Sequence, residues 1–353
     1  MRYLGEVALL LTSAQAPQPV RTLDAMETAE QWKVVKSDGL AAEASTVPGA
    51  DGKALRLAVD FSGRAGYAAV TRALPITFAD NYEISFKLKG TGPANQLQMK
   101  LVDASGENVW WWLRPTKAFT ADYETVRIKK RHIRFAWGPT KDRGLSRTAA
   151  IEFVLNAGEG GQGSFTVDDL TIRPLPPENA TLPPPKVSAS SGTQASAALD
   201  GRLDTAWRSA AAGAQSLTVD FGAAREFGGL VLRWAEGAHA AAYAIDLSDD
   251  GREWRTVRAV AESDGGSDPL LLTESEARYL RLRLIAGPGP AYVLNEFEVK
   301  DLAYGADPNA FISALAREAP RGTFPRGYSE QPYWTLVGVD GGLNSGLMGE
   351  DGA

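Results

Sequence analysis

The chain of 353 residues contains no cysteine, which excludes thiol catalysis and metal sites built on cysteine. Histidine is nearly absent as well. With only His132 and His239, neither a histidine-rich zinc centre nor a nucleophile–histidine triad is expected. Beyond the N-terminal segment, no run is long and apolar enough to span a membrane. The net charge is −6 and the basic residues are scattered, so the composition indicates no nucleic-acid partner.

Helical periodicity is also scarce, and short strand-like segments take its place. Residues 217–221 alternate and residues 229–234 run apolar over strand lengths, and both are bounded by glycine. Asp249-Asp250-Gly251 separates two such segments as a hairpin turn would, because glycine tolerates the positive φ that such a turn needs. The length allows two or three domains, and this spacing of strands is typical of antiparallel β-sandwiches.

Several blocks between Ser188 and Val299 carry a more specific pattern. Their order is Leu199-Asp200-Gly201-Arg202-Leu203-Asp204-Thr205-Ala206-Trp207, Leu217-Thr218-Val219-Asp220-Phe221-Gly222, Ser248-Asp249-Asp250-Gly251-Arg252-Glu253-Trp254, Ala277-Arg278-Tyr279-Leu280-Arg281-Leu282 and Asn295-Glu296-Phe297-Glu298-Val299. Together they resemble the discoidin, or coagulation-factor type C, domain. The resemblance implies a domain that binds and does not catalyse. It extends to the family-32 carbohydrate-binding modules of bacteria, which are attached to glycan-degrading enzymes.

The upstream part of the chain also consists of strand-like segments. It opens with Leu23-Asp24-Ala25-Met26-Glu27 and closes with Phe165-Thr166-Val167-Asp168-Asp169-Leu170-Thr171-Ile172. These edges resemble the jelly-roll family that includes family-11 carbohydrate-binding modules. A proline-rich linker at 175–186 separates the two regions. We therefore predict an all-β fold of two galactose-binding-like antiparallel β-sandwiches (jelly rolls) in tandem, at 22–174 and 187–301, with a short α/β C-terminal extension.

The two ends of the chain carry further signals. Residues 1–16 combine a basic start, an apolar run and a small-residue exit, which is typical of a secretory signal peptide. In the extension at 302–353, Asp307-Pro308 predicts the start of a helix that runs through Arg317, and residues 333–339 are strand-like. We interpret this stretch as the opening of a further module, completed beyond the C-terminus. The alternative is a tail that packs back on the discoidin-like domain.

Strand parity selects a candidate sugar-binding face in the first domain. In residues 96–101, apolar side chains alternate with Gln and Lys, so one side of this strand is core and the other is polar. Applied to residues 108–114, the same rule assigns Trp111 to the core and Trp110 and Trp112 to the polar face. Indoles stack on the apolar faces of sugars, while amides and charges bond their hydroxyls. The predicted carbohydrate-binding residues here are Trp110, Trp112, Arg114, Gln98, Lys100, Glu152 and Asn156. The alternative is that both indoles lie under a loop or an N-terminal strand.

Acidic residues in both domains resemble calcium ligands of the two families. In the discoidin-like domain, the resemblance implies a structural calcium held by side chains of Asp200 and Glu296, the hydroxyl or carbonyl of Thr205, and carbonyls near Ala197 and Asp204. In the first domain, Glu27 and Asp168 or Asp169 resemble the terminal calcium site of jelly-roll modules. Closely spaced oxygens are the ligands that this hard cation prefers.

The discoidin-like domain implies ligand loops at one end of its sandwich, near residues 209–215, 262–268 and 286–292. These loops are poor in aromatic residues, and Arg208 and Tyr292 are the anchors that they offer.

No spacing selects a pair of carboxylates facing each other across a cleft, as glycoside hydrolysis would need. We therefore predict a secreted or periplasmic, non-catalytic protein that binds polysaccharide or a glycoconjugate through two tandem modules. A glycan-degrading catalytic domain downstream in cis is the expected partner, with neither nucleic acid nor a membrane span. The alternatives are an adhesive or structural protein whose sandwiches bind proteins at the cell envelope, and an enzyme completed by sequence beyond the chain.

Overall fold

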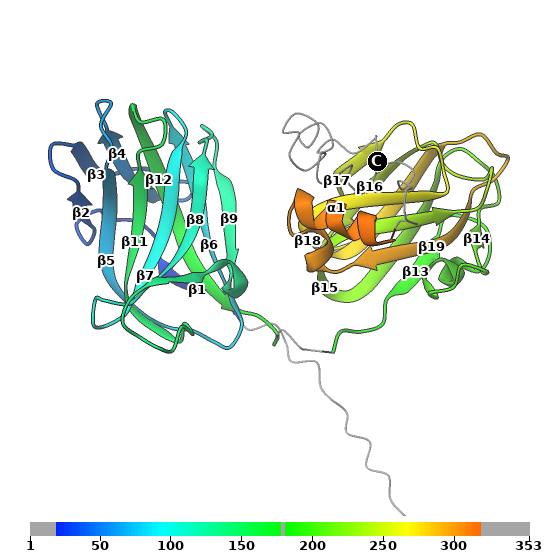
Figure 1. Cartoon of the computed structure of the whole chain (residues 1–353), viewed down its shortest axis with the longest axis horizontal. Helices are drawn as coiled ribbons and strands as arrows, with labels where there is room; N and C mark the ends of the chain where they lie inside the picture. Colours follow the sequence, from blue (N-terminus) through cyan, green and yellow to red (C-terminus); the bar gives the residue numbers. More distant parts are fainter. Residues whose placement is uncertain (1–18, 178–180, 319–353) are drawn as a thin grey trace, which may run out of the picture. The chain divides into compact units, whose positions relative to one another are not determined.

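The computed structural model describes residues 19–177 and 181–318, in two compact units that divide after Ala180. Each unit is built almost entirely of antiparallel strands (Figure 1). The predicted signal peptide and the strand-like residues 333–339 lie outside the described residues. Within the described ranges, no helix has the length and apolar character needed to cross a membrane.

The first unit is a β-sandwich of two six-stranded sheets. One sheet has the order β3-β4-β12-β6-β9, with β1 paired to β12, and the other has the order β10-β8-β7-β11-β5-β2. The elements are β1 (Arg21–Asp24), β2 (Lys33–Lys36), β3 (Ala41–Pro48), β4 (Lys53–Asp60), β5 (Tyr67–Thr77), β6 (Tyr82–Thr91), β7 (Asn95–Val102), β8 (Val109–Lys117), β9 (Glu124–Lys129), η1 (Lys130–His132), β10 (Arg134–Trp137), β11 (Arg147–Asn156) and β12 (Gln162–Pro174).

The core of this unit lies between the two sheets. Alternate residues along each central strand point inward, so Phe86 of β6, Phe153 of β11 and Phe165 of β12 are fully buried. Phe86 and Phe153 pack edge to face, with ring centroids 5.2 Å apart. Alternation along these strands therefore builds the core, and the remaining face of each sheet is left for polar side chains.

The second unit contains one seven-stranded sheet with the order β14-β19-β15-β18-β16-β17, and β13 also pairs with β15. Irregular pairing between Asp220 and Arg225 and between Phe227 and Gly229 interrupts the long pair β15–β18. The elements are β13 (Lys186–Ala189), η2 (Ala195–Leu199), β14 (Trp207–Arg208), β15 (Gln215–Trp234), β16 (Ala242–Ser248), β17 (Arg255–Val260), β18 (Ser267–Ala286), β19 (Val293–Lys300), η3 (Leu302–Gly305) and α1 (Pro308–Glu318).

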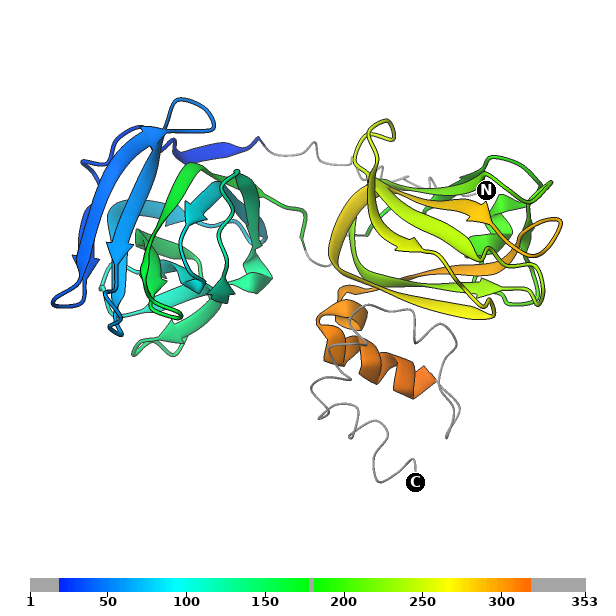
Figure 2. The same cartoon turned by 90° about the horizontal axis from the view of Figure 1, so that it is seen from above.

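The predicted C-terminal helix is present as α1 and begins at Pro308. Asp307 Oδ1 accepts the backbone N–H of Ala310 at 2.8 Å, which stabilises the first turn. The helix lies against the sheet of the second unit (Figure 2). Its apolar side packs on β15 and η3 through Phe311, Ile312 and Leu315. The ring of Phe311 meets that of Tyr304 edge to face, with centroids 5.1 Å apart. The helix is thus part of the second unit.

Candidate functional site

The two indoles that were expected on an open sheet face lie in the core of the first unit. The register pairs Trp110 with Leu101 and Trp112 with Met99, and these partners are fully buried. Trp110 is 6% exposed and Trp112 is 3% exposed. Trp110 Nε1–H donates to the carbonyl of Arg143 at 2.7 Å, in the loop that follows β10. The parity assignment of these two residues is therefore wrong, and the alternative that they lie under other chain segments holds.

The error has a simple physical origin. Side chains along a strand alternate between its two faces. If the inward-facing residue is assigned one position too early or too late, every side chain of the strand is placed on the wrong face. Val109, Trp111 and Leu113 form one apolar set and Trp110 and Trp112 form the other, and burying two indoles removes more apolar area from water. Arg114 follows the buried set, with its guanidinium 4.8 Å from the Trp112 ring, and it does not join Gln98 and Lys100 as predicted.

The opposite face of the same sheet carries a different pair of indoles. Trp111 is half-buried there, and its ring meets that of Trp137 edge to face at a centroid distance of 5.6 Å. Trp111 lies opposite Lys100, which lies opposite Glu152 on β11. Lys100 Nζ lies 5.2 Å from the centre of the Trp137 ring.

The predicted polar partners occupy this same face. Gln98 lies two residues before Lys100, on the same side of β7. Asn156 lies opposite Gln96, whose Oε1 accepts from Gln98 Nε2 at 2.5 Å and from Asn156 Nδ2 at 3.3 Å. Three of the four large hydrophobic side chains that are exposed among the described residues of the first unit are here: Val35, Tyr67 and Trp137. We name this surface the aromatic face; it comprises Trp111, Trp137, Tyr67, Val35, Gln96, Lys100, Glu152 and Asn156. The predicted contact Gln98 lies on the same side of the sheet but is only 5% exposed, so its role as a sugar contact is corrected to a structural one.

Sequence reasoning missed Trp137 because of an irregularity in the strand. Trp137 is two residues from Phe135, which packs against the core cluster, so simple alternation places both on the inner side. The register shifts between these two residues, and Trp137 instead lies opposite Val109 with its side chain 45% exposed. Tyr67 begins β5 and has no local signal of its face; only its pairing with Asn156 places it.

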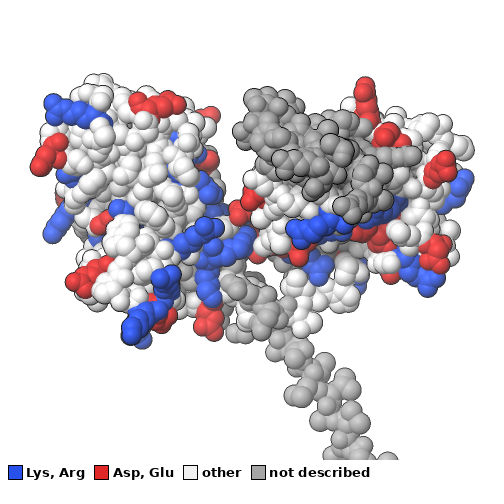
Figure 3. Space-filling model, viewed as in Figure 1, with Lys and Arg blue, Asp and Glu red and all other residues white. Residues whose placement is uncertain are grey.

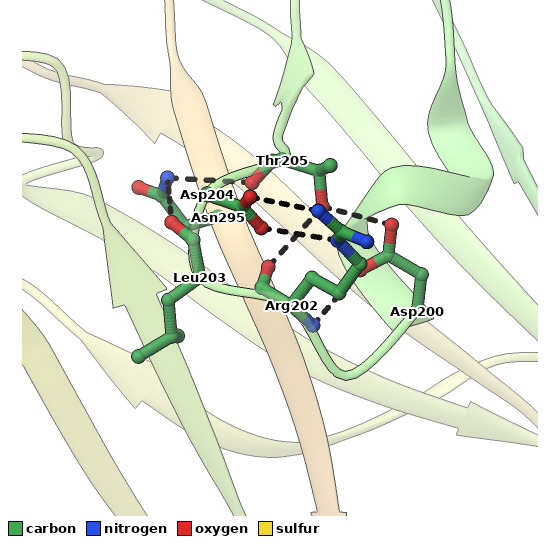
Figure 4. Close-up of polar contacts among 6 residues, drawn as sticks. All are labelled: Asp200, Arg202, Leu203, Asp204, Thr205 and Asn295. Carbon is green, nitrogen blue, oxygen red and sulfur yellow. Dashed lines mark hydrogen bonds and ion pairs between the residues drawn. The ribbon is translucent and has the colours of Figure 1, made fainter.

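In the second unit, the loop after η2 carries three of the predicted calcium ligands, Asp200, Asp204 and Thr205 (Figure 4). The Asp200 carboxylate accepts from the hydroxyl of Thr205 at 2.8 Å and from the backbone N–H of Arg202 at 2.9 Å. Glu296 reaches the same loop from β19, where its Oε2 accepts the backbone N–H of Gly201 at 2.9 Å. Ala197 lies in η2, one turn before Asp200.

The Asp204 carboxylate is engaged elsewhere. It forms a two-pronged ion pair with the guanidinium of Arg202, at 3.0 and 2.8 Å, and both side chains are largely exposed. Burial raises the pKa of Glu296, and the nearby negative charge of Asp200 acts in the same direction, whereas backbone N–H donors oppose it. A bound cation would relieve this repulsion, so the side chains of Asp200 and Glu296 fit calcium. In the described ranges, no three acidic or histidine side chains converge, and backbone oxygens would have to complete the set.

The predicted acidic site of the first unit surrounds the turn between β3 and β4. Asp168 Oδ2 accepts the backbone N–H of Ala50 at 2.7 Å, and both Glu27 oxygens lie within 3.3 Å of the backbone nitrogen of Lys53. A Cβ at Gly49 would lie 2.6 Å from Asp168 Oδ2, so the turn approaches the carboxylate closely only as glycine. Glu27 and Asp168 thus contact this turn. The third predicted residue, Asp169, is exposed and has a φ of 50°.

Two of the predicted ligand loops of the second unit, 209–215 and 286–292, contact each other through a backbone hydrogen bond from Ala212 to Pro290, but Tyr292 is no surface anchor. Tyr292 is fully buried, and its hydroxyl bonds both the N–H and the carbonyl of Gly213 at 3.0 Å. It therefore ties loop 286–292 to loop 209–215, and its role as a sugar contact is corrected to a structural one. Arg208 remains exposed on β14.

A buried carboxylate supports the same end of this unit. Asp268 is 2% exposed, and its Oδ2 accepts from Trp234 Nε1 at 2.9 Å, Tyr243 Oη at 2.8 Å and Ser263 Oγ at 2.6 Å. These donors come from β15, β16 and the loop before β18. Burial raises the pKa of Asp268, against the opposing effect of the three hydrogen bonds. The residue holds strands and loop together and does not face solvent.

Comparisons with known proteins agree with the sequence blocks. The F5/8 type C domain model matches residues 185–297. Among curated proteins, none is significantly similar to the chain. A similar solved structure is chitosan-binding module 2 of a chitosanase/glucanase from Paenibacillus sp. IK-5 in complex with chitotriose. It is 29% identical with a TM-score of 0.31, over 33% of this chain and 95% of that chain.

Two further solved structures are carbohydrate-binding modules with bound sugars. The family 11 module from Clostridium thermocellum, in complex with a β-1,3-1,4-mixed-linked tetrasaccharide, is 21% identical with a TM-score of 0.37, over 43% of this chain and 94% of that chain. The family 32 module from C. perfringens NanJ, in complex with galactose, is 23% identical with a TM-score of 0.30, over 33% and 92%. Residues 185–297 of this chain form an F5/8 type C domain.

Proposed function

We propose that this chain binds polysaccharide without cleaving it, and that the aromatic face of the first unit is its principal binding surface. The observation that carries the proposal is the Trp111–Trp137 pair beside Lys100, Glu152 and the amides of β7 and β11. Exposed aromatic side chains that gather on one face of a sheet are costly in water unless they serve contact with a ligand.

The chemistry of the face suits a sugar chain. The exposed indole of Trp137 offers a flat apolar surface for the C–H groups of a pyranose ring. Lys100 is a donor and Glu152 is an acceptor, while Gln96 and Asn156 present both functions to ring hydroxyls. Because Trp111, Lys100 and Glu152 stand on the paired strands β8, β7 and β11, little ordering of the backbone is needed there on binding.

We further propose that the F5/8 type C domain is a second, accessory binding module and that both modules serve a glycan-degrading catalytic region of a secreted or periplasmic protein. The resemblance of its sequence blocks to family-32 modules supports this role. Arg208 is exposed at the loop end of the domain and can donate hydrogen bonds to sugar hydroxyls. We expect that incubation of the chain with chitosan, mixed-linked β-1,3-1,4-glucan or a galactan releases no shortened products.

Sugar binding should depend on the exposed indoles and not on the buried ones. We expect Trp111→Ala and Trp137→Ala each to weaken polysaccharide affinity by about 1–2 kcal/mol, roughly 5- to 30-fold, since each removes a stacking surface. Affinity electrophoresis against chitosan, mixed-linked β-1,3-1,4-glucan and a galactan measures this. Trp254→Ala, which removes a half-buried indole from the second unit, is the matched control. Unchanged retardation of the Trp111/Trp137 double variant on every polysaccharide retarded by the parent would overturn the proposal.

We also propose that Asp200 and Glu296 hold a structural calcium ion in the F5/8 type C domain. An ion that binds only the folded state adds stability by mass action, about 2.7 kcal/mol at a hundredfold excess over its Kd. Chelation should therefore lower the Tm of this domain in calorimetry, and Asp200→Asn should abolish the effect. Asp204→Asn is the control, because that side chain pairs with Arg202. If the Tm is the same with calcium and with chelator at equal ionic strength, the site is excluded.

A further inference from the structure

The first unit has a pocket at the open side of its sandwich, away from the aromatic face. Strand β10 pairs with β8 only from Val109 to Trp111, so the second half of β8 has an uncovered edge. Strand β9 forms the edge of the other sheet. Between these two edges lies a pocket of about 190 Å³, whose lining includes Leu88 of β6, Trp112 of β8 and residues 124–127 of β9.

The lining of this pocket is rich in cations. Arg114, Lys117 and Arg127 line it, against the single carboxylate of Glu124. Lys117 forms an ion pair with Glu124, whereas the ion pairs within the described ranges include neither Arg114 nor Arg127. Figure 3 shows further Lys and Arg side chains gathered near η1, the segment that follows β9. Two exposed guanidiniums therefore remain available to an anion.

The buried wall of the pocket supplies another donor. The side chain of Trp112 is only 3% exposed, and its indole N–H has no hydrogen-bond acceptor among the described residues. A buried donor without a partner is unfavourable, and an acceptor that reaches it from the pocket would satisfy it. Leu88 and Val126 make the remaining wall apolar. Free donors beside apolar carbon suit a ligand that combines an oxyanion with a hydrocarbon-like surface.

We propose that this pocket binds the oxyanion group, a carboxylate or a sulfate, of an acidic sugar residue. The planar guanidinium matches both groups with two parallel hydrogen bonds. The volume is below the range of about 300–1,000 Å³ for drug-sized ligands, so the pocket takes one residue and not an oligosaccharide. Trp111 and Trp112 point to opposite sides of β8, so this site is separate from the aromatic face. The two proposals can therefore be tested independently.

The indole N–H resonance of Trp112 reports on this pocket directly. In the ¹⁵N-labelled full chain, Trp112→Phe assigns the resonance by its disappearance. We expect glucuronate or glucose 6-sulfate to shift it saturably, the stronger of the two identifying the preferred oxyanion, while glucose at equal concentration and ionic strength leaves it in place. Arg127→Gln should lower the affinity for the anionic sugar at least tenfold. Arg56→Gln, which removes an arginine of the same sheet outside the pocket, should have no effect.

Four results would overturn the proposal. A shift with glucose as large as that with the charged sugars would do so, and so would a resonance that neither glucuronate nor glucose 6-sulfate moves. Acetate and inorganic sulfate must not match the sugars, since that would reduce the site to a general anion contact. Retention of full affinity in Arg127→Gln would contradict the assigned cation. The Trp111→Ala variant should keep this response, so a failure of the aromatic face in polysaccharide binding is distinguishable from a failure here.

Discussion

Replacing Trp110 by alanine is expected to lower the free energy of unfolding of the first unit by about 3–5 kcal/mol, the usual cost of removing a buried indole. The side chain is 6% exposed, packs edge to face on Phe135 at 5.5 Å, and satisfies the carbonyl of Arg143. Its loss leaves a cavity and an unpaired carbonyl in the loop that covers the sheet. Calorimetry of the full chain measures the effect, because the transition of the second unit serves as an internal reference.

Trp111→Ala is the matched control for this measurement. It removes the same indole from the next position of the same strand, where the side chain is only half-buried. We expect a smaller loss of stability than in Trp110→Ala, together with the loss of polysaccharide affinity described above. If Trp111→Ala proved the more destabilising of the two, the assignment of faces on β8 would be wrong.

Asp268→Ala should destabilise the F5/8 type C domain by about 2–4 kcal/mol. The substitution deprives Trp234 Nε1–H and Ser263 Oγ–H of their buried acceptor, and each unpaired donor costs about 1–3 kcal/mol. Part of that loss is offset because a carboxylate no longer has to be buried. Asp268→Asn keeps one acceptor oxygen of the same shape and should cost less at neutral pH. Urea denaturation of the three proteins compares them, and equal losses for Ala and Asn would contradict a role based on accepting hydrogen bonds.

The same residue should make stability depend on pH in a defined direction. Burial raises the pKa of Asp268 in the folded domain, so the folded state binds the proton more tightly than the unfolded chain does. This contribution is fully present below the unfolded pKa of about 3.9 and is lost as pH rises through the folded pKa. The stability of the parent relative to Asp268→Asn should therefore fall as pH rises above about 4. A difference that rises with pH would show that the hydrogen bonds outweigh burial.

The local pattern of the sequence was sufficient for the fold class. Period-two alternation, glycine-bounded turns and the absence of helical periodicity predicted tandem antiparallel β-sandwiches, and both units are built of antiparallel strands. Asp307-Pro308 likewise predicted the start of the one α-helix among the described residues. These features depend on contacts within a few residues, such as the capping of Ala310 by Asp307, so local chemistry decides them. The blocks of the F5/8 type C domain are also local, and the family model matches them at residues 185–297.

Which side chains reach solvent was decided only by tertiary structure. Residues 109–113 are all large and apolar, so alternation offers two equivalent solutions, and only the pairing of Trp112 with Met99 and of Trp110 with Leu101 selects the inner set. The irregular register before Trp137 then turns a second indole outward to meet Trp111. Tyr292 can be buried because its hydroxyl forms hydrogen bonds with both the N–H and the carbonyl of Gly213, which is distant in sequence. Each outcome depends on a partner strand or loop far along the chain, and no local pattern encodes that register.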